Sequence, residues 1–339
     1  MTVNPSRIKL WSIGGGKGGI GKSMISLGLG ISLARLGKKV ILIDGDLGGA
    51  NLHTLMGVRY PHVTLEHFLL RKVEHLEDII IPTQVEGIGL ICGADDILGA
   101  ANPTYSQKIR LLNQIEALPA QYVLLDLGAG TAFNILDFFN YSPGRIVLFT
   151  SQTTSLQNAY GFIKSALYRK ISRDFAKDEA VTNLLYQDSE EEGRKSVGTV
   201  SELLTQLKEK SPESHDRLLK LLADYQIFLV ANMVKSNADM NAPDIINSVC
   251  TDFLSLKPEV MGNVSYDPVI EAAVNRMHQF PLSNKKSKAA SNLAQIALKI
   301  VKESMLPRSG WEPQAEKSRD VEEASMAPLI RQSSLTPAT

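Results

Sequence analysis

A glycine-rich loop between an apolar run and a helical pattern constrains this chain more than any other feature of its sequence. Residues 14–23 read GGGKGGIGKS, which satisfies the pattern G-x-x-x-x-G-K-[ST] with Gly16 and Gly21 as framing glycines. Glycines let successive backbone N–H groups turn inward around phosphate oxygens, and the following helix directs the positive end of its dipole at them. The pattern therefore predicts a site for the phosphates of a nucleotide.

The side chains at the end of this loop are expected to contact the phosphates and a metal ion. Lys22 is expected to reach the β- and γ-phosphates, and the Ser23 hydroxyl is expected to ligate Mg²⁺. A dinucleotide-binding fold is the competing interpretation, because Gly14, Gly16 and Gly19 also match G-x-G-x-x-G. The GKS ending argues against it. The predicted nucleotide-binding residues of the loop are Gly16, Lys17, Gly18, Gly19, Ile20, Gly21, Lys22 and Ser23.

Short apolar runs alternate with longer helical patterns along most of the chain. Near-continuous Val, Ile and Leu indicates strands that are buried on both faces, as in a parallel sheet covered by helices. The expected strands are residues 8–13, 40–43, 88–92, 122–127, 146–150, 227–232 and 259–264. The expected helices are residues 22–36, 104–118, 131–140, 155–170, 239–256 and 287–303. This alternation predicts a doubly wound α/β fold with a mostly parallel sheet and helices on both faces.

Two stretches depart from the alternation. Residues 169–224 are charged and lack strand patterns, and apolar residues at helical spacing over 200–207 and 218–222 predict two helices in a charged helical insertion. Residues 305–339 are rich in proline and poor in apolar side chains, a composition typical of disorder. We therefore predict one P-loop nucleotide-binding domain over residues 1–304, followed by a disordered tail.

Composition excludes several classes of protein. The 36 basic side chains balance 36 acidic ones, so nothing indicates a nucleic-acid binder that relies on a broad positive field. The two cysteines, Cys92 and Cys250, form no CxxC pair for zinc, iron–sulfur or dithiol chemistry. No apolar run reaches the roughly 18 to 20 residues that cross a bilayer. The sequence predicts a cytoplasmic protein, and association with the inner face of the membrane stays open.

The stretch KGGIGKS resembles the deviant Walker A motif of the MinD/ParA family of P-loop ATPases, which carries a second lysine, here Lys17. In that family the extra lysine reaches across a nucleotide-sandwich dimer to the phosphates bound by the partner subunit. The resemblance implies an ATP-dependent homodimer with Lys17 in that role. The MinD-like branch, which includes regulators of flagellar number and placement, is the most similar through Met56-Gly57, Asn232-Met233-Val234 and Tyr266-Asp267-Pro268.

Residues 43–52, IDGDLGGANL, resemble the switch I motif of this family, in which an asparagine follows an aspartate by five residues. Asp46 and Asn51 match those two positions. A carboxylate at the end of a strand beside the phosphate loop can orient the attacking water. We expect Asp46 to do this and to take part in the Mg²⁺ site, while Asp44 supports the Mg²⁺ shell or the loop geometry.

Residues 122–130, YVLLDLGAG, have the arrangement of a Walker B strand followed by a switch II loop. Asp126 is expected to hold Mg²⁺, and Gly130 to let the backbone approach the γ-phosphate. Asn232 ends a later strand and resembles the family position whose amide pairs with adenine. Capping of a helix is the alternative role for Asn232. The predicted catalytic residues are Lys17, Lys22 and Asp46, and the predicted metal ligands are Ser23, Asp46 and Asp126.

Two functions stay open at this stage. The first is a slow, Mg²⁺-dependent ATPase that dimerises with ATP and, through an unidentified protein partner, positions or regulates a cellular structure in cell division, flagellar placement or cargo partitioning. The second is a regulatory binding module that sequesters a protein partner and keeps ATP as a structural ligand. The helix expected at 287–303 is amphipathic and bears lysines, and its apolar stripe is expected to pack into the core. Conditional contact with a membrane is the alternative, although no membrane-targeting helix like that of MinD-like proteins stands out.

Overall fold

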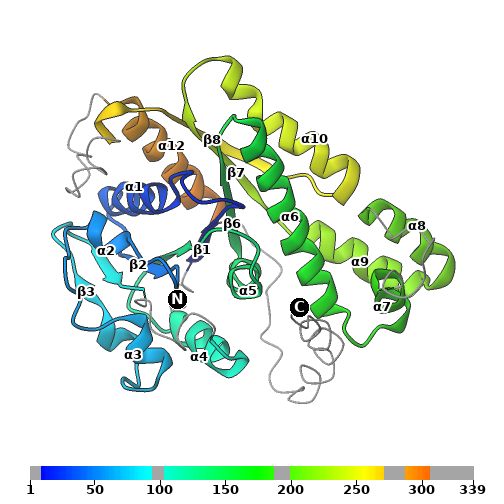
Figure 1. Cartoon of the computed structure of the whole chain (residues 1–339), viewed down its shortest axis with the longest axis horizontal. Helices are drawn as coiled ribbons and strands as arrows, with labels where there is room; N and C mark the ends of the chain where they lie inside the picture. The colour runs from blue at the N-terminus through cyan, green and yellow to red at the C-terminus, as the bar shows by residue number, and fades with distance from the viewer. Residues whose placement is uncertain (1–8, 94–102, 187–198, 271–286, 306–339) are drawn as a thin grey trace, which may run out of the picture. The chain divides into compact units, whose positions relative to one another are not determined.

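One eight-stranded sheet organises the part of the chain that the computed structural model describes, which comprises residues 9–93, 103–186, 199–270 and 287–305. The strand order is β3-β4-β2-β5-β1-β6-β7-β8 (Figure 1). All neighbouring strands are parallel except β3 and β4. The strands are β1 (Lys9–Gly14), β2 (Val40–Gly45), β3 (Ile81–Pro82), β4 (Ile88–Ile91), β5 (Tyr122–Leu127), β6 (Gly144–Phe149), β7 (Phe228–Val234) and β8 (Glu259–Ser265).

Helices cover both faces of this sheet, which confirms the doubly wound α/β fold. One hydrophobic core lies beneath α1 (Lys22–Arg35), α2 (Leu52–Leu55) and α12 (Lys288–Glu303). The other lies beneath the remaining helices near the sheet (Figure 1). These are α3 (Leu65–Leu69), α4 (Tyr105–Ile115), α5 (Phe133–Tyr141), α6 (Thr153–Asp174) and α10 (Ala242–Leu254).

The strand β3 is an element that the sequence pattern did not predict. It is two residues long, pairs antiparallel with β4 at the edge of the sheet, and contains Pro82. Proline is tolerated at such an edge because its missing N–H removes no central ladder bond. A two-residue strand is also too short to show any hydrophobic period.

The predicted charged insertion contains three helices among its described residues. Two of them, α8 (Val200–Lys210) and α9 (Pro212–Asp224), lie where helices were predicted, and they pack against each other. The third, α7 (Glu179–Tyr186), was not predicted. The helix α6 continues to Asp174, so the first residues assigned to the insertion belong to a helix of the sheet-covering layer. The predicted tail, apart from Met305, lies outside the described residues.

The last described helix, α12, packs its apolar stripe into the core as expected. Leu293, Ile296, Ala297 and Ile300 are buried and Val301 is partly buried against α1 and the sheet. This face is therefore not available for binding a membrane surface. In the described part of the chain, no helix has both the length and the apolar character that crossing a bilayer requires.

Candidate nucleotide-binding site

The glycine-rich loop joins the carboxyl end of β1 to the first turn of α1. Gly19 and Gly21 have φ angles of 79° and 89°, a left-handed conformation that glycine adopts without a steric cost. Lys22 is the first residue of α1, and its Nζ donates a hydrogen bond to the Lys17 carbonyl oxygen at 3.4 Å. The Lys22 side chain therefore turns back over the loop, where a phosphate chain would lie.

Two other elements fix the shape of the loop by touching glycines. A Cβ at Gly16 would collide with the backbone carbonyl oxygen of Asn158 on α6. A Cβ at Gly21 would lie 2.5 Å from Asn232 Nδ2, and this amide donates a hydrogen bond to the Ile20 carbonyl oxygen at 2.8 Å. The framing glycines are thus required by close packing as well as by backbone conformation.

Three carboxylates meet at the carboxyl ends of β2 and β5, beside this loop. In the sheet register Asp126 pairs with Ile13 on one side and with Asp44 on the other. Ser26 Oγ donates to Asp126 Oδ1 at 2.9 Å, and Ser23 is a second hydrogen-bond partner of this carboxylate. Asp46 lies next to Gly128, since a Cβ on that glycine would be 3.0 Å from Asp46 Oδ1.

Asp44 acts as a brace within switch I. Its Oδ1 accepts the Asp46 N–H at 3.2 Å, and its Oδ2 accepts the Leu52 N–H at 2.9 Å. These two bonds tie both ends of the loop to one buried carboxylate. Of the two roles expected for Asp44, the contacts favour support of the loop geometry.

The electrostatics of the cluster favour an added cation. Burial, reinforced by the nearby Asp126 charge, raises the pKa of Asp44 to about 7. Burial also raises the pKa of Asp126 to about 6, although hydrogen bonds from Ser23 and Ser26 oppose this. Burial lowers the pKa of Lys22, while Asp126 and Asp46 raise it. Asp126 and Asp46 face Lys22, and the hydroxyls of Ser23 and Ser26 lie beside Asp126. The described residues contain no group of three acidic, histidine or cysteine side chains that could hold a metal ion alone. One or two carboxylates and a hydroxyl fit Mg²⁺, which in nucleotide sites usually takes its other ligands from water and phosphate oxygens.

This cluster predicts how the stability of the nucleotide-free protein depends on pH. Carboxyl groups titrate near pH 4 when the chain is unfolded, whereas Asp44 and Asp126 keep their protons to about pH 7 and 6 when it is folded. The folded state therefore binds more protons in this window, and stability falls as pH rises through it, by at most about 1.4 kcal/mol per pH unit for each group.

Denaturant unfolding in EDTA at pH 6, 7 and 8 measures this effect. The wild-type protein is expected to be more stable at pH 6 than at pH 8, and Asp44→Asn is expected to gain less on acidification. Because the Asp126 charge is coupled to Asp44, the difference between their slopes measures the titration of Asp44 together with the change that its removal causes at Asp126. Equal slopes would show that Asp44 does not titrate in this range.

The structure brings most of the predicted site residues together but leaves four at the margin of the site. Lys22, Ser23, Asp46 and Asp126 interact with one another. The Gly130 N–H donates to the Gly15 carbonyl oxygen at 3.3 Å, which joins switch II to the loop. The predicted residues at the margin are Lys17, which is exposed at the loop tip with Gly18 and Gly19, and Asn51, whose exposed amide donates to Gly49 within switch I.

Two site residues were missed by the sequence analysis. Ser26 lies three residues after Ser23 on α1, a spacing that places both on one helix face, so the helical period that follows the motif could have indicated it. Asn158 on α6 touches Gly16 from a distant part of the chain, and no local pattern could have indicated that contact.

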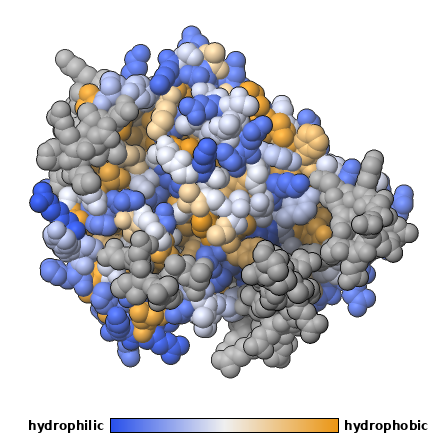
Figure 2. Space-filling view, in the orientation of Figure 1, coloured by the Kyte–Doolittle hydropathy of each residue, from blue (hydrophilic) through white to orange (hydrophobic). Residues whose placement is uncertain are grey.

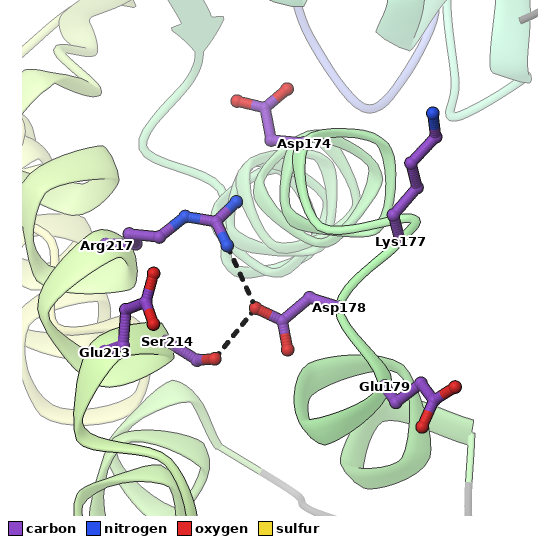
Figure 3. A pocket seen from close by; sticks show the side chains of 7 residues that line it. All are labelled: Asp174, Lys177, Asp178, Glu179, Glu213, Ser214 and Arg217. Atoms are coloured by element: carbon purple, nitrogen blue, oxygen red, sulfur yellow. Dashed lines mark hydrogen bonds and ion pairs between the residues drawn. The ribbon is translucent and has the colours of Figure 1, made fainter.

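A separate hollow of about 320 Å³ lies between α9 and the turn that joins α6 to α7 (Figure 3). Its lining includes four carboxylates and Arg217, and it contains none of the predicted site residues. The Asp178 carboxylate already accepts hydrogen bonds from Ser214 Oγ at 2.8 Å and from Arg217 at 3.1 Å. These contacts hold the helices together, and the hollow is not the nucleotide site.

Comparison with known proteins identifies a family that matches this chain. The family described as "CobQ/CobB/MinD/ParA nucleotide binding domain" matches residues 11–280. An uncharacterized ATP-binding protein of Methanocaldococcus jannaschii is 31% identical over 57% of this chain and 70% of its own length. The antiactivator FleN of Pseudomonas aeruginosa is 28% identical over 46% of this chain, which spans 56% of that relative.

Solved structures agree with this match at the level of the fold. The septum site-determining protein MinD of Pyrococcus horikoshii, solved in complex with Mg-ADP, superposes with a TM-score of 0.58 and 20% identity, covering 88% of this chain and 98% of that one. The family match spans most of the chain and includes the phosphate loop and both acidic stretches. The chain belongs to the CobQ/CobB/MinD/ParA nucleotide-binding family of ATP-binding P-loop proteins.

Proposed function

We propose that this protein is a slow, Mg²⁺-dependent ATPase that dimerises with ATP and thereby positions or regulates a cellular structure. The observation that carries the proposal is that the two lysines of the loop differ in burial and in the direction of their side chains. Lys22 is partly buried and turns back over its own loop, whereas Lys17 is exposed at the loop tip. One lysine can serve the phosphates of its own subunit while the other reaches a partner subunit.

The chemistry assigned to the site follows from its groups. The loop backbone and Lys22 bind the phosphates, while Ser23, Asp46 and Asp126 hold Mg²⁺. When bound, this ion neutralises charge on the β- and γ-phosphate oxygens. Asp46 orients the attacking water, since its carboxylate lies beside switch II at Gly128.

Three other residues complete the proposed nucleotide site. Asn51 and Gly130 respond to the γ-phosphate from the two switch loops. Asn232 hydrogen-bonds to the adenine ring. Its Nδ2 already donates to the Ile20 carbonyl oxygen, and its Oδ1 accepts a hydrogen bond from the adenine amino group. We assign these tasks to one ATPase domain over residues 1–304, with 169–224 as its charged helical segment and 305–339 as a tail.

The mass of the Asp46→Ala protein tests this proposal. Removing the residue that orients water slows hydrolysis by about a hundredfold or more, so ATP should persist and trap the dimer. Light scattering should give twice the chain mass of 37.1 kDa with ATP·Mg²⁺ and the single mass with ADP·Mg²⁺. Asp252→Ala, an exposed carboxylate on α10, is the matched control and should hydrolyse ATP at the wild-type rate. A monomer with both nucleotides would contradict the dimeric switch.

The second candidate is a regulatory binding module that sequesters a protein partner and keeps ATP as a structural ligand. The similarity to the antiactivator FleN favours it. It requires nucleotide binding but neither dimerisation nor turnover. In the same experiment it predicts a monomer with both nucleotides and a thermal stability that rises equally with ATP and ADP.

The proposed place of action is the cytoplasm, including the inner face of the membrane when a partner recruits the dimer there. The buried apolar stripe of α12 argues against direct membrane binding by that helix. A protein partner that recognises the ATP state is part of the proposal. The similarity to MinD, named as a septum site-determining protein, supports positioning as the class of role.

A further inference from the structure

A group of arginines and aromatic rings is formed by residues of α4, α5 and α6, none of which is among the predicted nucleotide-binding residues. We call Tyr105, Phe133, Arg169 and Arg173 the arginine–aromatic surface. The Arg169 guanidinium lies over the Phe133 ring, 4.5 Å from its centroid, and the Arg173 guanidinium lies 5.5 Å from the centroid of Tyr105. Three helices from distant parts of the sequence thus contribute to one patch.

A buried carboxylate holds this patch in shape. Asp137 on α5 is 4% exposed and accepts hydrogen bonds from Arg169 Nε at 2.9 Å, Arg173 at 3.1 Å and Lys108 Nζ at 2.8 Å. Both carboxylate oxygens are used, so the two guanidinium groups are fixed in orientation before any ligand arrives. Fixed side chains lose little conformational entropy on binding, which favours affinity.

The rings remain accessible although the cations beside them are held in place. Phe133 is 56% exposed and Tyr105 is 42% exposed. Aromatic residues and arginine are enriched at the centres of protein–protein interfaces and supply most of the binding energy there. Figure 2 shows that the coloured hydrophobic residues on the face it draws form small groups among hydrophilic ones. The arginine–aromatic surface itself offers two exposed rings with cations beside them, and such a patch suits a short segment rather than a broad apolar partner.

The charge of the patch selects the kind of segment. Lys108, Arg169 and Arg173 share the single carboxylate of Asp137, which leaves an excess of two positive charges. An excess of two is too small for nucleic acid, whose binding draws on many phosphate contacts. It is also too small for anionic lipid, where clusters of about four to eight basic residues are typical. A peptide with two or three carboxylates and an apolar side chain matches both the charge and the rings.

The patch is also close to switch II in the chain. Phe133 is the first residue of α5 and follows Gly130 by three positions, and the Gly130 N–H is bonded to the phosphate loop at Gly15. A change of switch II on loss of the γ-phosphate would therefore move the start of α5 relative to α6.

We infer that the arginine–aromatic surface binds an acidic protein segment that carries an apolar side chain, and that it does so differently in the ATP and ADP states. The second clause rests on the proposed nucleotide switch, and the first does not. The partner contributes carboxylates to Arg169 and Arg173 and an apolar group to the rings of Phe133 and Tyr105.

The test uses the full chain and a phage-displayed library of random twelve-residue peptides, selected on the protein with ATP·Mg²⁺. Enriched peptides are expected to be acidic and to contain an apolar residue. Fluorescence anisotropy should then show about tenfold weaker binding to Phe133→Ala and to Arg173→Gln. Lys164→Gln is the matched control: this residue is also on α6 and its Nζ lies over a ring, that of Tyr168 at 5.6 Å. Its affinity should stay within about twofold of the wild type.

The outcomes separate this inference from the proposed function. Selection of no peptide, of peptides without an acidic bias, or of peptides indifferent to Phe133→Ala and Arg173→Gln would overturn it. So would binding of a 30-base-pair DNA duplex or of phosphatidylglycerol vesicles that Arg173→Gln abolishes. Equal peptide affinity with ATP and ADP would refute only the nucleotide dependence. Binding of a fluorescent ATP analogue, measured in parallel, should be unchanged in all three variants.

Discussion

Lys22→Ala is expected to weaken ATP binding by about a hundredfold, whereas Lys17→Ala leaves binding to the single subunit within about threefold of the wild type. Hydrogen bonds from a cation to an ionised group contribute about 1.5 to 3 kcal/mol each, and Lys22 is placed to meet more than one phosphate oxygen. Its removal also leaves Asp126 and Asp46 facing the phosphates without the positive charge that now offsets them.

The two lysines form a matched pair, because both lie in the same loop and differ in where they point. Lys17 is exposed, so its loss removes little from the nucleotide of its own subunit. Titration calorimetry with ATP·Mg²⁺ gives the affinities, and light scattering gives the mass. Lys17→Ala should bind ATP and stay monomeric. Tight ATP binding by Lys22→Ala would disprove the assigned phosphate site, and an ATP-dependent dimer of Lys17→Ala would disprove the role of Lys17 between subunits.

The central sheet could be predicted because strands that are buried on both faces appear in the sequence as continuous apolar runs. Strands such as Tyr122–Leu127 are fully buried and therefore consist of continuous apolar residues up to Asp126. The loop 14–23 was equally easy to predict, since its motif lies within ten residues, although the close packing of Gly16 and Gly21 against Asn158 and Asn232 could not be seen in the sequence. Short elements without an apolar period, such as β3 and the four-residue α2, show no such run.

Side-chain roles that depend on distant partners could not be predicted. The Asp44 carboxylate bonds to the Leu52 N–H at the far end of switch I, which distinguishes a loop brace from a metal ligand only once the loop is folded. Asn51 matched a family position, yet its amide is turned toward Gly49. The partners of Asp137 lie 29 to 36 residues away on two other helices, so nothing near Asp137 in the sequence marks it as important.

Asp137→Ala is expected to lower the free energy of unfolding by about 3 to 5 kcal/mol, the usual cost of leaving a buried charge without its partner. The Lys108 side chain is only 9% exposed, so it would lose its counter-ion without gaining water. Arg169 and Arg173 are more exposed and can rehydrate. Asp174→Ala is the matched control on α6: its pair with Lys170 is more accessible to water and should contribute about 0.5 kcal/mol or less.

The pH dependence of the stability lost in Asp137→Ala tests whether the charged carboxylate is the cause. Burial alone would raise the pKa of Asp137, but hydrogen bonds and charge interactions from Arg169 and Lys108 outweigh it and hold the pKa below its ordinary value. A carboxylate with a lowered pKa stabilises the fold above the pKa of the unfolded chain, and this contribution is lost as pH falls through the folded value. Urea unfolding of wild type and Asp137→Ala should therefore differ by a constant amount from pH 5 to 8 and converge below about pH 4.

A double variant separates the cost of the unpaired Lys108 charge from the cost of lost packing at Asp137. Replacing both members of the buried pair, in Asp137→Leu with Lys108→Met, removes the uncompensated charge and should recover part of the stability that Asp137→Ala loses. A loss below about 1 kcal/mol for Asp137→Ala, or no recovery in the double variant, would show that Lys108 reaches water without its partner. In that case Asp137 would not be the anchor that holds Arg169 and Arg173 against their rings, and the arginine–aromatic surface would have to be ordered by its ring contacts alone.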